Sequence, residues 1–249
     1  MNNNQIYIGI DDTDNLETRG TGFRARQLVW YLQANKLATG IAITRHQLLV
    51  DDRIPYTSHN SSACIAVEPL DNIQIDQLMD SARSFMLEIA AEGSDVGLCL
   101  ATPAQAAEVV RFGQMAKIEV VQQQEALELA KQHAIRLEGL TGTHQGIIGS
   151  LSAVGLHVYG NDGRYIWVKG IRELAGQILS MHDLIRNTGI EKVSLLEGKE
   201  IRNASAEIDL GLWPRPVRID SFAVLLVEQQ NEHHKYKVLE KDIIKSVRP

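Results

Sequence analysis

Short apolar runs alternate with segments of helical periodicity along the first part of the chain. The apolar runs predict strands over residues 5–10, 38–50, 63–68 and 98–101. Helical spacing of apolar positions predicts helices over residues 23–35, 73–91, 103–113, 123–137 and 146–155. Strands that alternate with helices in this way are typical of a mixed α/β (α+β) fold.

The pattern changes after residue 155 and weakens after about residue 170. The turn residues Asn161-Asp162-Gly163 predict a hairpin between Val158 and Tyr165. Further on, the proline-containing segment 213–216 predicts an extended connection, and strands are predicted over residues 217–228 and 235–240. We therefore expect a first domain over residues 1–165 and a C-terminal α/β region over residues 166–249. The C-terminal region is expected either to pack beside the site or to mediate a homodimer.

Composition narrows the class of protein. The chain has 249 residues, 44% of them hydrophobic, and a net charge of −6, which argues against a basic nucleic-acid-binding protein. Cys64 and Cys99 each lie in an apolar run without metal-type spacing, so we expect two buried thiols. No apolar run approaches membrane-spanning length. These features predict a cytoplasmic protein with no membrane partner.

The densest group of chemically active side chains is the motif Gly-Ile-Asp-Asp-Thr-Asp at residues 9–14. Its aspartates directly follow the first predicted strand, and open α/β sheets tend to bind ligands at the carboxyl ends of their strands. Neighbouring carboxylates repel each other unless a cation lies among them. Mg²⁺ suits this pattern, because it takes one or two carboxylates and completes its shell with water and phosphate oxygens. We interpret Asp11, Asp12 and Asp14 as metal ligands; the alternative is an acidic turn that caps a helix.

Three further segments are candidates for binding a phosphate or a base. Residues 20–22, Gly-Thr-Gly, precede a predicted helix whose N-terminal amides favour anions, although a simple turn explains them equally well. The polar run 57–62 offers His59 as a proton carrier and Asn60 as an amide, or it is an ordinary polar loop. The glycine-rich segment 142–149 either approaches phosphates closely or permits close helix packing, and both can hold together.

These motifs occur in an order that resembles the N-terminal half of the archaeal isoleucine-tRNA 2-agmatinylcytidine synthetase family. The resemblance rests on residues 9–14, Gly20, residues 54–57 with Asn60, and residues 146–155. It implies a kinase-like nucleotide-binding domain that includes a ferredoxin-like α/β subdomain, with ATP and Mg²⁺ as cofactors. The resemblance puts the three aspartates beside the ATP phosphates.

The residues and the resemblance together define an expected site. We expect nucleotide contacts from Gly20, Thr21, Gly22, Tyr56, Ser58, Asn60, Gly146 and Gly149. We expect catalytic roles for Asp12, Thr21 and His59.

The chain also departs from the family pattern. The family's Gly-Met-Cys-Thr-Thr loop is replaced by Gly-Thr-Gly-Phe-Arg at residues 20–24, and its basic run after Ile-Pro-Tyr is replaced by the uncharged or weakly basic residues 57–62. The chain also has no room for the family's OB-fold and zinc ribbon, which engage tRNA, and no cysteine pairs that could bind zinc, so we expect a stand-alone form without these domains.

Three functions follow from these observations. The first is a Mg²⁺-dependent, ATP-binding phosphotransferase that acts on a small molecule or a nucleoside-type acceptor. The second is a partner-dependent tRNA-modification module in which Arg24, Arg26, Arg45 and Arg53 form a basic patch; the acidic balance disfavours tRNA as the partner. The third is a nucleotide or metabolite sensor without catalysis.

Overall fold

The computed structural model describes residues 4–55, 59–232 and 234–247. The chain divides into two compact units, unit 1 (residues Met1–Tyr159) and unit 2 (residues Gly160–Pro249). The division falls a few residues before the boundary proposed from the sequence. Each unit is described separately below.

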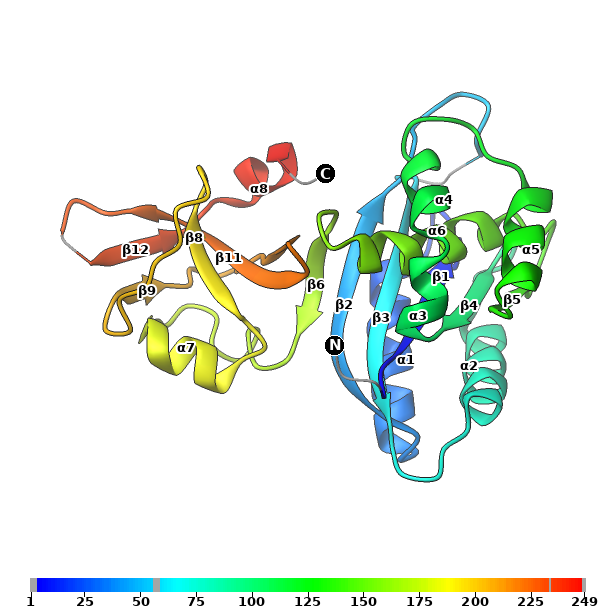
Figure 1. Cartoon of the computed structure of the whole chain (residues 1–249), viewed down its shortest axis with the longest axis horizontal. Coiled ribbons are helices and arrows are strands. Elements are labelled where there is room, and N and C mark those ends of the chain that lie inside the picture. The colour runs from blue at the N-terminus through cyan, green and yellow to red at the C-terminus, as the bar shows by residue number, and fades with distance from the viewer. Residues whose placement is uncertain (1–3, 56–58, 233, 248–249) are drawn as a thin grey trace. The chain divides into compact units, whose positions relative to one another are not determined.

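The first part of unit 1 is a ferredoxin-like βαββαβ arrangement (Figure 1). Its elements are β1 (Ile6–Asp11), α1 (Thr21–Ala34), β2 (Ala38–Gln47), β3 (Ser61–Pro69), α2 (Ile75–Ile89) and β4 (Gly97–Ala101). The strands lie in the order β4-β1-β3-β2, and every neighbouring pair is antiparallel. The expected mixed α/β class with a ferredoxin-like subdomain is confirmed. Because the sheet is antiparallel, the rule for parallel α/β sheets does not explain where a ligand would bind.

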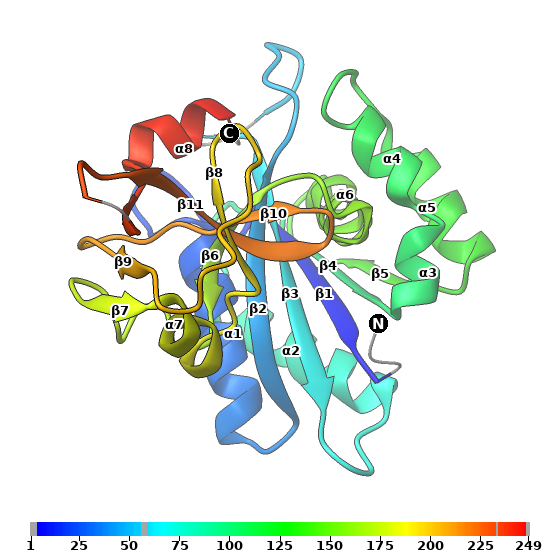
Figure 2. The same cartoon turned by 60° about the vertical axis from the view of Figure 1, so that its left-hand side comes forward.

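The second part of unit 1 adds one edge strand and a layer of helices. Its elements are α3 (Pro103–Ala107), α4 (Val110–Met115), α5 (Gln123–Gln132), β5 (Arg136–Gly139) and α6 (Gly146–Tyr159). Strand β5 pairs with β4 at the edge of the sheet. Helices α1 and α2 cover one face of the sheet, and α6 with α3, α4 and α5 covers the other (Figure 2).

Alternation of side chains along β1 decides which face each of its residues occupies. Ile8 and Ile10 are fully buried on one side of the strand. Tyr7 belongs to the core cluster that includes the buried side chains of α6, and Gly9 lies against the backbone of Ser150 in that helix. Asp11 follows the same alternation, so its carboxylate points to the side of the sheet that α6 covers.

Helix α6 packs unusually close to the sheet because both surfaces carry glycine. A Cβ on Gly97 of β4 would collide with the backbone of Gly146, and a Cβ on Gly149 would collide with the Asp11 carboxylate. The helix is buried from Gly146 through His157, apart from a partly exposed Ile148. The helix predicted from residue 146 is confirmed, and the interpretation of its small residues as close packing is correct.

Unit 2 is a smaller mixed sheet with two short helices. Its elements are β6 (Arg164–Val168), β7 (Ile178–Ser180), α7 (Met181–Asn187), β8 (Lys192–Leu195), β9 (Glu207–Asp209), β10 (Val217–Ile219), β11 (Phe222–Gln229), β12 (Lys235–Val238) and α8 (Lys241–Val247). The strands follow the order β6-β10-β11-β12-β9-β7, and β8 pairs with β11 in parallel. Val217, Val224 and Leu226 form its core with Ile244 of α8.

Two predictions about turns in this region were wrong. Val158 lies within α6, so residues 161–163 connect a helix to a strand and do not form a hairpin. The single strand expected over residues 217–228 is the β10–β11 hairpin. Its two turn residues, Asp220 and Ser221, have φ values of 49° and 68°, the left-handed conformations that a tight two-residue turn requires.

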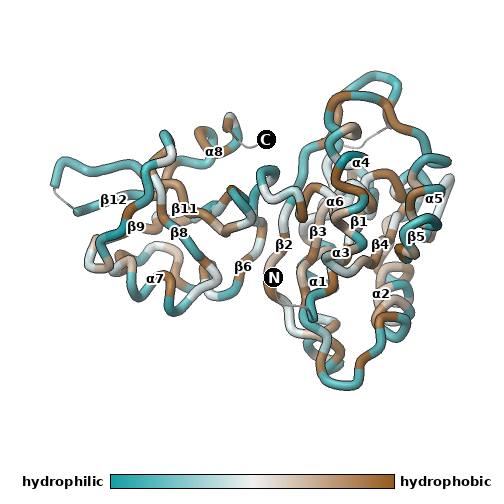
Figure 3. Tube along the Cα trace, in the orientation of Figure 1, coloured by the Kyte–Doolittle hydropathy of each residue, from teal (hydrophilic) through white to brown (hydrophobic). Residues whose placement is uncertain are grey.

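Two helix predictions in unit 1 also needed correction. The helix expected over residues 103–113 is divided into α3 and α4 by turn bonds, in which the amides of Glu108 and Val109 donate three residues back. The helix expected over residues 123–137 ends at Gln132, and Ala134 adopts a φ of 52°, which helical backbone does not allow. Helix α5 is amphipathic, and Figure 3 shows its hydrophobic and hydrophilic positions.

The two cysteines lie in the interior of unit 1, as the sequence predicts. Cys64 and Cys99 are buried on the two strands that flank Gly9, and they form no disulfide within the described residues. Burial raises the pKa of the Cys99 thiol well above its usual value.

In the part of the chain that the structure describes, no helix has both the length and the apolar character needed to cross a membrane.

Candidate functional site

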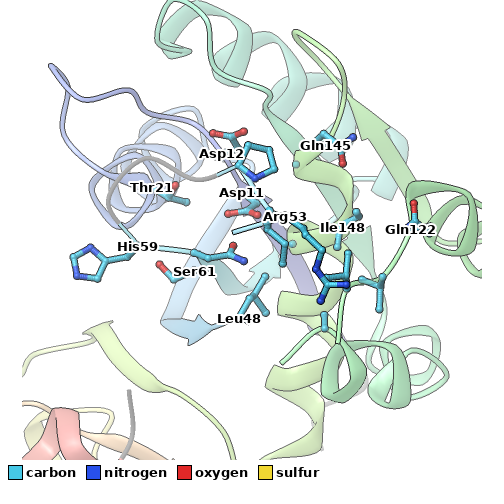
Figure 4. A pocket seen from close by; sticks show the side chains of 18 of the residues that line it. Asp11, Asp12, Thr21, Leu48, Arg53, His59, Ser61, Gln122, Gln145 and Ile148 are labelled. Carbon is cyan, nitrogen blue, oxygen red and sulfur yellow. The ribbon is translucent and has the colours of Figure 1, made fainter. Parts of the chain in front are cut away.

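Unit 1 contains a cavity of about 230 Å³ at the carboxyl end of β1 (Figure 4). Five segments form its wall: the end of β1 with the acidic loop, the start of α1, the β2–β3 connection, the α4–α5 connection and the start of α6. The sequence-predicted residues among its lining are Asp11, Asp12, Asp14, Thr21, His59, Asn60, Gly146 and Gly149. The fold therefore brings together segments that are far apart in the sequence.

Asp11 is the last residue of β1, and its carboxylate is enclosed between the strand and α6. Burial raises its pKa to about 7, and the neighbouring Asp12 carboxylate contributes in the same direction. The backbone amide of Asp12 donates a hydrogen bond to the Asp11 carboxylate and partly opposes this effect. Asp11 is thus a carboxylate whose negative charge the protein itself compensates poorly.

Asp12 has a similar environment and an unusual backbone. Its φ of 49° lies in the left-handed region, which a non-glycine residue rarely adopts. The pKa of Asp12 is raised to about 6, mainly by burial. Repulsion from the Asp95 and Asp14 carboxylates contributes in the same direction. The backbone amide of Asp95 donates to the Asp12 carboxylate. Asp11 and Asp12 are therefore two neighbouring carboxyl groups at the cavity, and the negative charge of each is unfavourable in its surroundings.

Asp95 is a member of this acidic group that sequence reasoning missed. Its carboxylate accepts hydrogen bonds from the backbone amide of Thr143 and from the Thr143 hydroxyl, the latter at 2.6 Å. Its backbone oxygen accepts from the Gly146 amide at 3.0 Å. Asp95 thus holds the loop before α6 in place. It lies in a short glycine-flanked loop, and no local pattern distinguishes it from an ordinary turn residue.

Asp14 has a different role from the first two aspartates. Its Oδ1 accepts hydrogen bonds from the Thr21 amide at 3.0 Å and from the Thr21 hydroxyl at 2.9 Å. The Thr13 hydroxyl lies 3.2 Å from the Thr21 hydroxyl. Because Gly20 at the N-cap position has no side chain, the Asp14 carboxylate caps α1 from the preceding loop. Of the two interpretations of the acidic motif, metal ligands or a helix-capping turn, Asp14 matches the second.

The acidic residues suit a cation that takes most of its ligands from phosphate oxygens and water. No group of three or more His, Cys, Asp or Glu side chains suited to a metal ion occurs within the described residues. The three aspartates thus do not form a complete protein cage for a metal. Asp11 and Asp12 instead offer one or two carboxylates with raised pKa values beside a cavity, which is the donor set that Mg²⁺ uses together with phosphate oxygens and water.

The basic residues near the acidic motif are held by other partners. Of the four arginines considered as a basic patch, Arg53 alone is among the described lining residues. Its Nε and Nη2 atoms lie 2.7 and 2.8 Å from the two oxygens of Asp51. This guanidinium holds the pKa of Asp51 below its usual range. A basic patch formed by Arg24, Arg26, Arg45 and Arg53 therefore does not line the cavity.

The start of α6 borders the cavity, but its first amides are already hydrogen-bonded. The Ile147 amide donates to the His144 oxygen at 3.3 Å, and the Ile148 amide donates to the Gln145 oxygen at 3.1 Å. The Gly146 amide is bonded to the Asp95 backbone oxygen as well. The start of α6 would therefore attract an anion through the helix dipole and not through these three amides. Gly146 and Gly149 are required for packing here, whatever they contribute to a ligand.

The other expected residues are distributed unevenly. Gly20 and Gly22 lie at the start of α1 but are not among the described residues that line the cavity. Asn60 lines it, although its side-chain amide donates to the Leu49 oxygen at 2.6 Å and so also holds the β2–β3 connection. His59 is exposed at the cavity edge. Tyr56 and Ser58 lie outside the described residues.

One wall of the cavity was not expected from the sequence. It is formed by the α4–α5 connection, namely Ala116, Glu119, Val120, Val121 and Gln122. These residues carry no recognisable motif, so the sequence contains no signal for their position. They reach the cavity because α4 and α5 both pack on α6.

Comparisons with known proteins show similarity to tRNA-related enzymes. No protein-family model and no curated protein matches the sequence. A solved structure of a tRNA fluorescent labeling enzyme is 26% identical with a TM-score of 0.53, over 61% of this chain and 36% of that one. The structure of apo TiaS, an agmatidine synthetase for an isoleucine tRNA, is 25% identical with a TM-score of 0.52, over 61% of this chain and 35% of that one.

A third solved structure is a complex of TiaS with an isoleucine tRNA and ATP. It is 25% identical with a TM-score of 0.53, over 61% of this chain and 36% of that one. The chain spans about a third of the length of these proteins. The resemblance to part of the agmatidine synthetase that the sequence motifs predict is confirmed in three dimensions.

Proposed function

We propose that unit 1 binds ATP with Mg²⁺ in its cavity and that the chain carries out an ATP-dependent transfer reaction in RNA modification. The observation that carries the proposal is the pair Asp11 and Asp12, two carboxylates of raised pKa facing a cavity at the end of β1. The similarity to a synthetase crystallised with tRNA and ATP supports both the nucleotide and the reaction class.

Each residue of the acidic motif has a separate part in this proposal. Asp11 and Asp12 would hold Mg²⁺, which would supply positive charge against the negative charge that develops during phosphoryl transfer. Asp14 fixes Thr21 and the start of α1, so that the Thr21 hydroxyl remains at the cavity wall. His59 at the cavity edge orients the acceptor or accepts its proton.

The geometry of the cavity favours a small group as the direct acceptor. Its described lining contains one arginine, Arg53, and the guanidinium of Arg53 is paired with Asp51, so the lining offers little positive charge to a polynucleotide backbone. We therefore propose that a small molecule or a single nucleoside enters the site. A polynucleotide would need contacts elsewhere on the chain.

A transfer assay tests the proposal. The chain is incubated with ATP labelled at the γ-phosphate, Mg²⁺, and either RNA, nucleosides or a primary amine. We expect the label to be transferred, or released as pyrophosphate together with AMP, in a reaction that requires Mg²⁺ and falls at least about 100-fold in Asp12→Asn, because the variant loses one anionic ligand. Asp52→Asn, an exposed aspartate outside the cavity lining, is the matched control. Equal turnover in both variants would contradict the assignment.

A further inference from the structure

Unit 2 contains a cavity of its own, of about 270 Å³. Its lining is Tyr165, Ile166, Trp167, Val168, Ile171, Arg172, Ala175, Leu212, Trp213, Pro214, Arg215 and Pro216. Two tryptophans, one tyrosine and two arginines thus surround one hollow, and no described lining residue is acidic. The lining thus combines aromatic rings with guanidinium groups, and this chemistry suits a ligand that is both planar and negatively charged.

The two arginines of this cavity are stacked with one tryptophan. The guanidinium carbon of Arg215 lies 4.4 Å from the centroid of the Trp213 ring, and that of Arg172 lies 5.3 Å from it. Such cation–π contacts hold the guanidinium planes in place. A guanidinium stacked in this way can still donate hydrogen bonds from its edge to a phosphate.

The wall that carries Trp213 is anchored on both sides within unit 2. On one side the Tyr165 amide donates to the Pro216 oxygen at 2.8 Å. On the other side the Gly176 amide donates to the Gly211 oxygen at 2.6 Å. Pro214 and Pro216 restrict the backbone between these bonds. Little conformational entropy therefore needs to be lost when a ligand binds.

Despite this anchoring, the cavity rim exposes large apolar surface. Trp213 is 52% exposed and its neighbour Leu212 is 85% exposed. An exposed aromatic ring beside fixed cations is typical of sites where unpaired bases stack. Residues 160–249 also contain 14 Lys and Arg against 13 Asp and Glu, whereas residues 1–159 contain 11 against 18. The acidic balance of the chain thus resides in unit 1, and unit 2 does not repel a polyanion.

We propose that this cavity binds a segment of single-stranded RNA, with a base against the Trp167 and Trp213 rings and a phosphate on Arg172 and Arg215. The inference deepens the proposed function, since it supplies the RNA contact that the unit 1 cavity lacks, and its relevance rests on that function. The tryptophan rings favour RNA over an acidic peptide. A peptide carboxylate would use the guanidinium groups, but it would leave the two rings without a planar partner.

Fluorescence anisotropy of a short labelled single-stranded RNA on the full chain tests the proposal. We expect binding that weakens as salt rises, because phosphate contacts release counterions. Trp213→Ala is expected to weaken binding by about 5-fold to 100-fold, the range found for stacked aromatics. Arg172→Gln should weaken binding as well, and Arg172→Lys should restore it only in part, because lysine keeps the charge without the plane.

Two controls keep the test interpretable. Arg202→Gln removes an equally charged, exposed side chain of unit 2 outside the cavity lining and should leave RNA affinity unchanged. Trp213→Phe retains a ring, so a retained affinity in this variant together with a loss in Trp213→Ala would separate stacking from misfolding. Thermal melting of every variant establishes that unit 2 is folded.

Specific outcomes would overturn the proposal. Equal RNA affinity in wild type, Trp213→Ala and Arg172→Gln would exclude this cavity as the site. Competition by polyglutamate as effective as that by unlabelled RNA would identify an acidic-peptide site, and competition by ATP alone would identify a mononucleotide site. ATP binding measured on the same samples separates the two proposals. RNA binding that depends on Trp213 in a chain that binds no ATP would sustain this inference and reject the proposed function.

Discussion

At the residue scale, the acidic motif combines two kinds of aspartate. Asp14 accepts hydrogen bonds from Thr21 and caps a helix, whereas Asp11 and Asp12 are partly buried next to each other and have raised pKa values. The sequence predicts a costly cluster, because adjacent carboxylates repel. It does not predict this division of roles, since only the fold brings α6 over Asp11 and Asp95 beside Asp12.

The burial of Asp11 predicts how stability depends on pH without a divalent cation. Its folded pKa of about 7 lies above the unfolded value of 3.8, so the folded state holds the proton over that range. The stability contributed by this proton is lost as the pH rises through the folded pKa. We expect the free energy of unfolding in EDTA to fall between pH 5 and pH 8, by on the order of 1–4 kcal/mol.

The Asp11→Asn variant isolates this contribution. The variant lacks this titrating group and its repulsion of Asp12, so it should show a smaller fall in denaturant-unfolding experiments over the same pH range. Added Mg²⁺ should restore wild-type stability at pH 8 and have less effect on the variant. Identical pH dependence of the two proteins would mean that Asp11 is an ordinary carboxylate.

At the element scale, α6 packs tightly on the strands beneath it, because a Cβ added at either surface would collide with the other. The sequence predicts this helix and its small residues but not its partner strands, because nothing local relates Gly149 to Asp11 or Gly146 to Gly97. The long amphipathic helix α2 was predictable from its apolar face alone. The split between α3 and α4 was not, because it depends on turn bonds that carry no periodic signal.

Substitution of the glycine beside Asp11 tests this contact. A Cβ at Gly149 would collide with the Asp11 carboxylate, so Gly149→Ala should destabilise the chain by about 1–3 kcal/mol and weaken ATP binding. A Cβ at Gly20 meets only the Asp14 carboxylate oxygen, at an ordinary 3.8 Å, so Gly20→Ala is the control. Chemical denaturation and ATP titration of the two variants give the comparison. A Gly149→Ala protein as stable as the control would show that α6 can move off the strand.

At the scale of the whole molecule, the two units were unequally accessible to sequence reasoning. Unit 1 follows a regular βαββαβ order with strong apolar periodicity, so its class and ferredoxin-like part could be predicted. Unit 2 contains strands as short as three residues, such as β7 and β9. Runs of that length carry too little periodicity to be recognised. The parallel pairing of β8 with β11 is equally invisible in the sequence.

The candidate site shows the same limit. Its acidic end lies within one motif, whereas the opposite wall comes from the α4–α5 connection, which reaches the cavity only through packing on α6. The cavity of unit 2 joins residues 165–175 to residues 212–216, and no motif relates the two segments. A sequence can reveal chemistry that is clustered along the chain, but chemistry assembled by packing requires the structure.

Calorimetric titration with ATP, in the presence and absence of Mg²⁺, tests the central claim most directly. The account predicts that wild-type protein binds ATP only with Mg²⁺ and that Asp12→Asn loses this binding while keeping its fold and melting behaviour. Asp52→Asn should bind like the wild type. ATP affinity that is independent of Mg²⁺ and equal in all three proteins would contradict the assignment of Asp11 and Asp12 to a nucleotide–metal site.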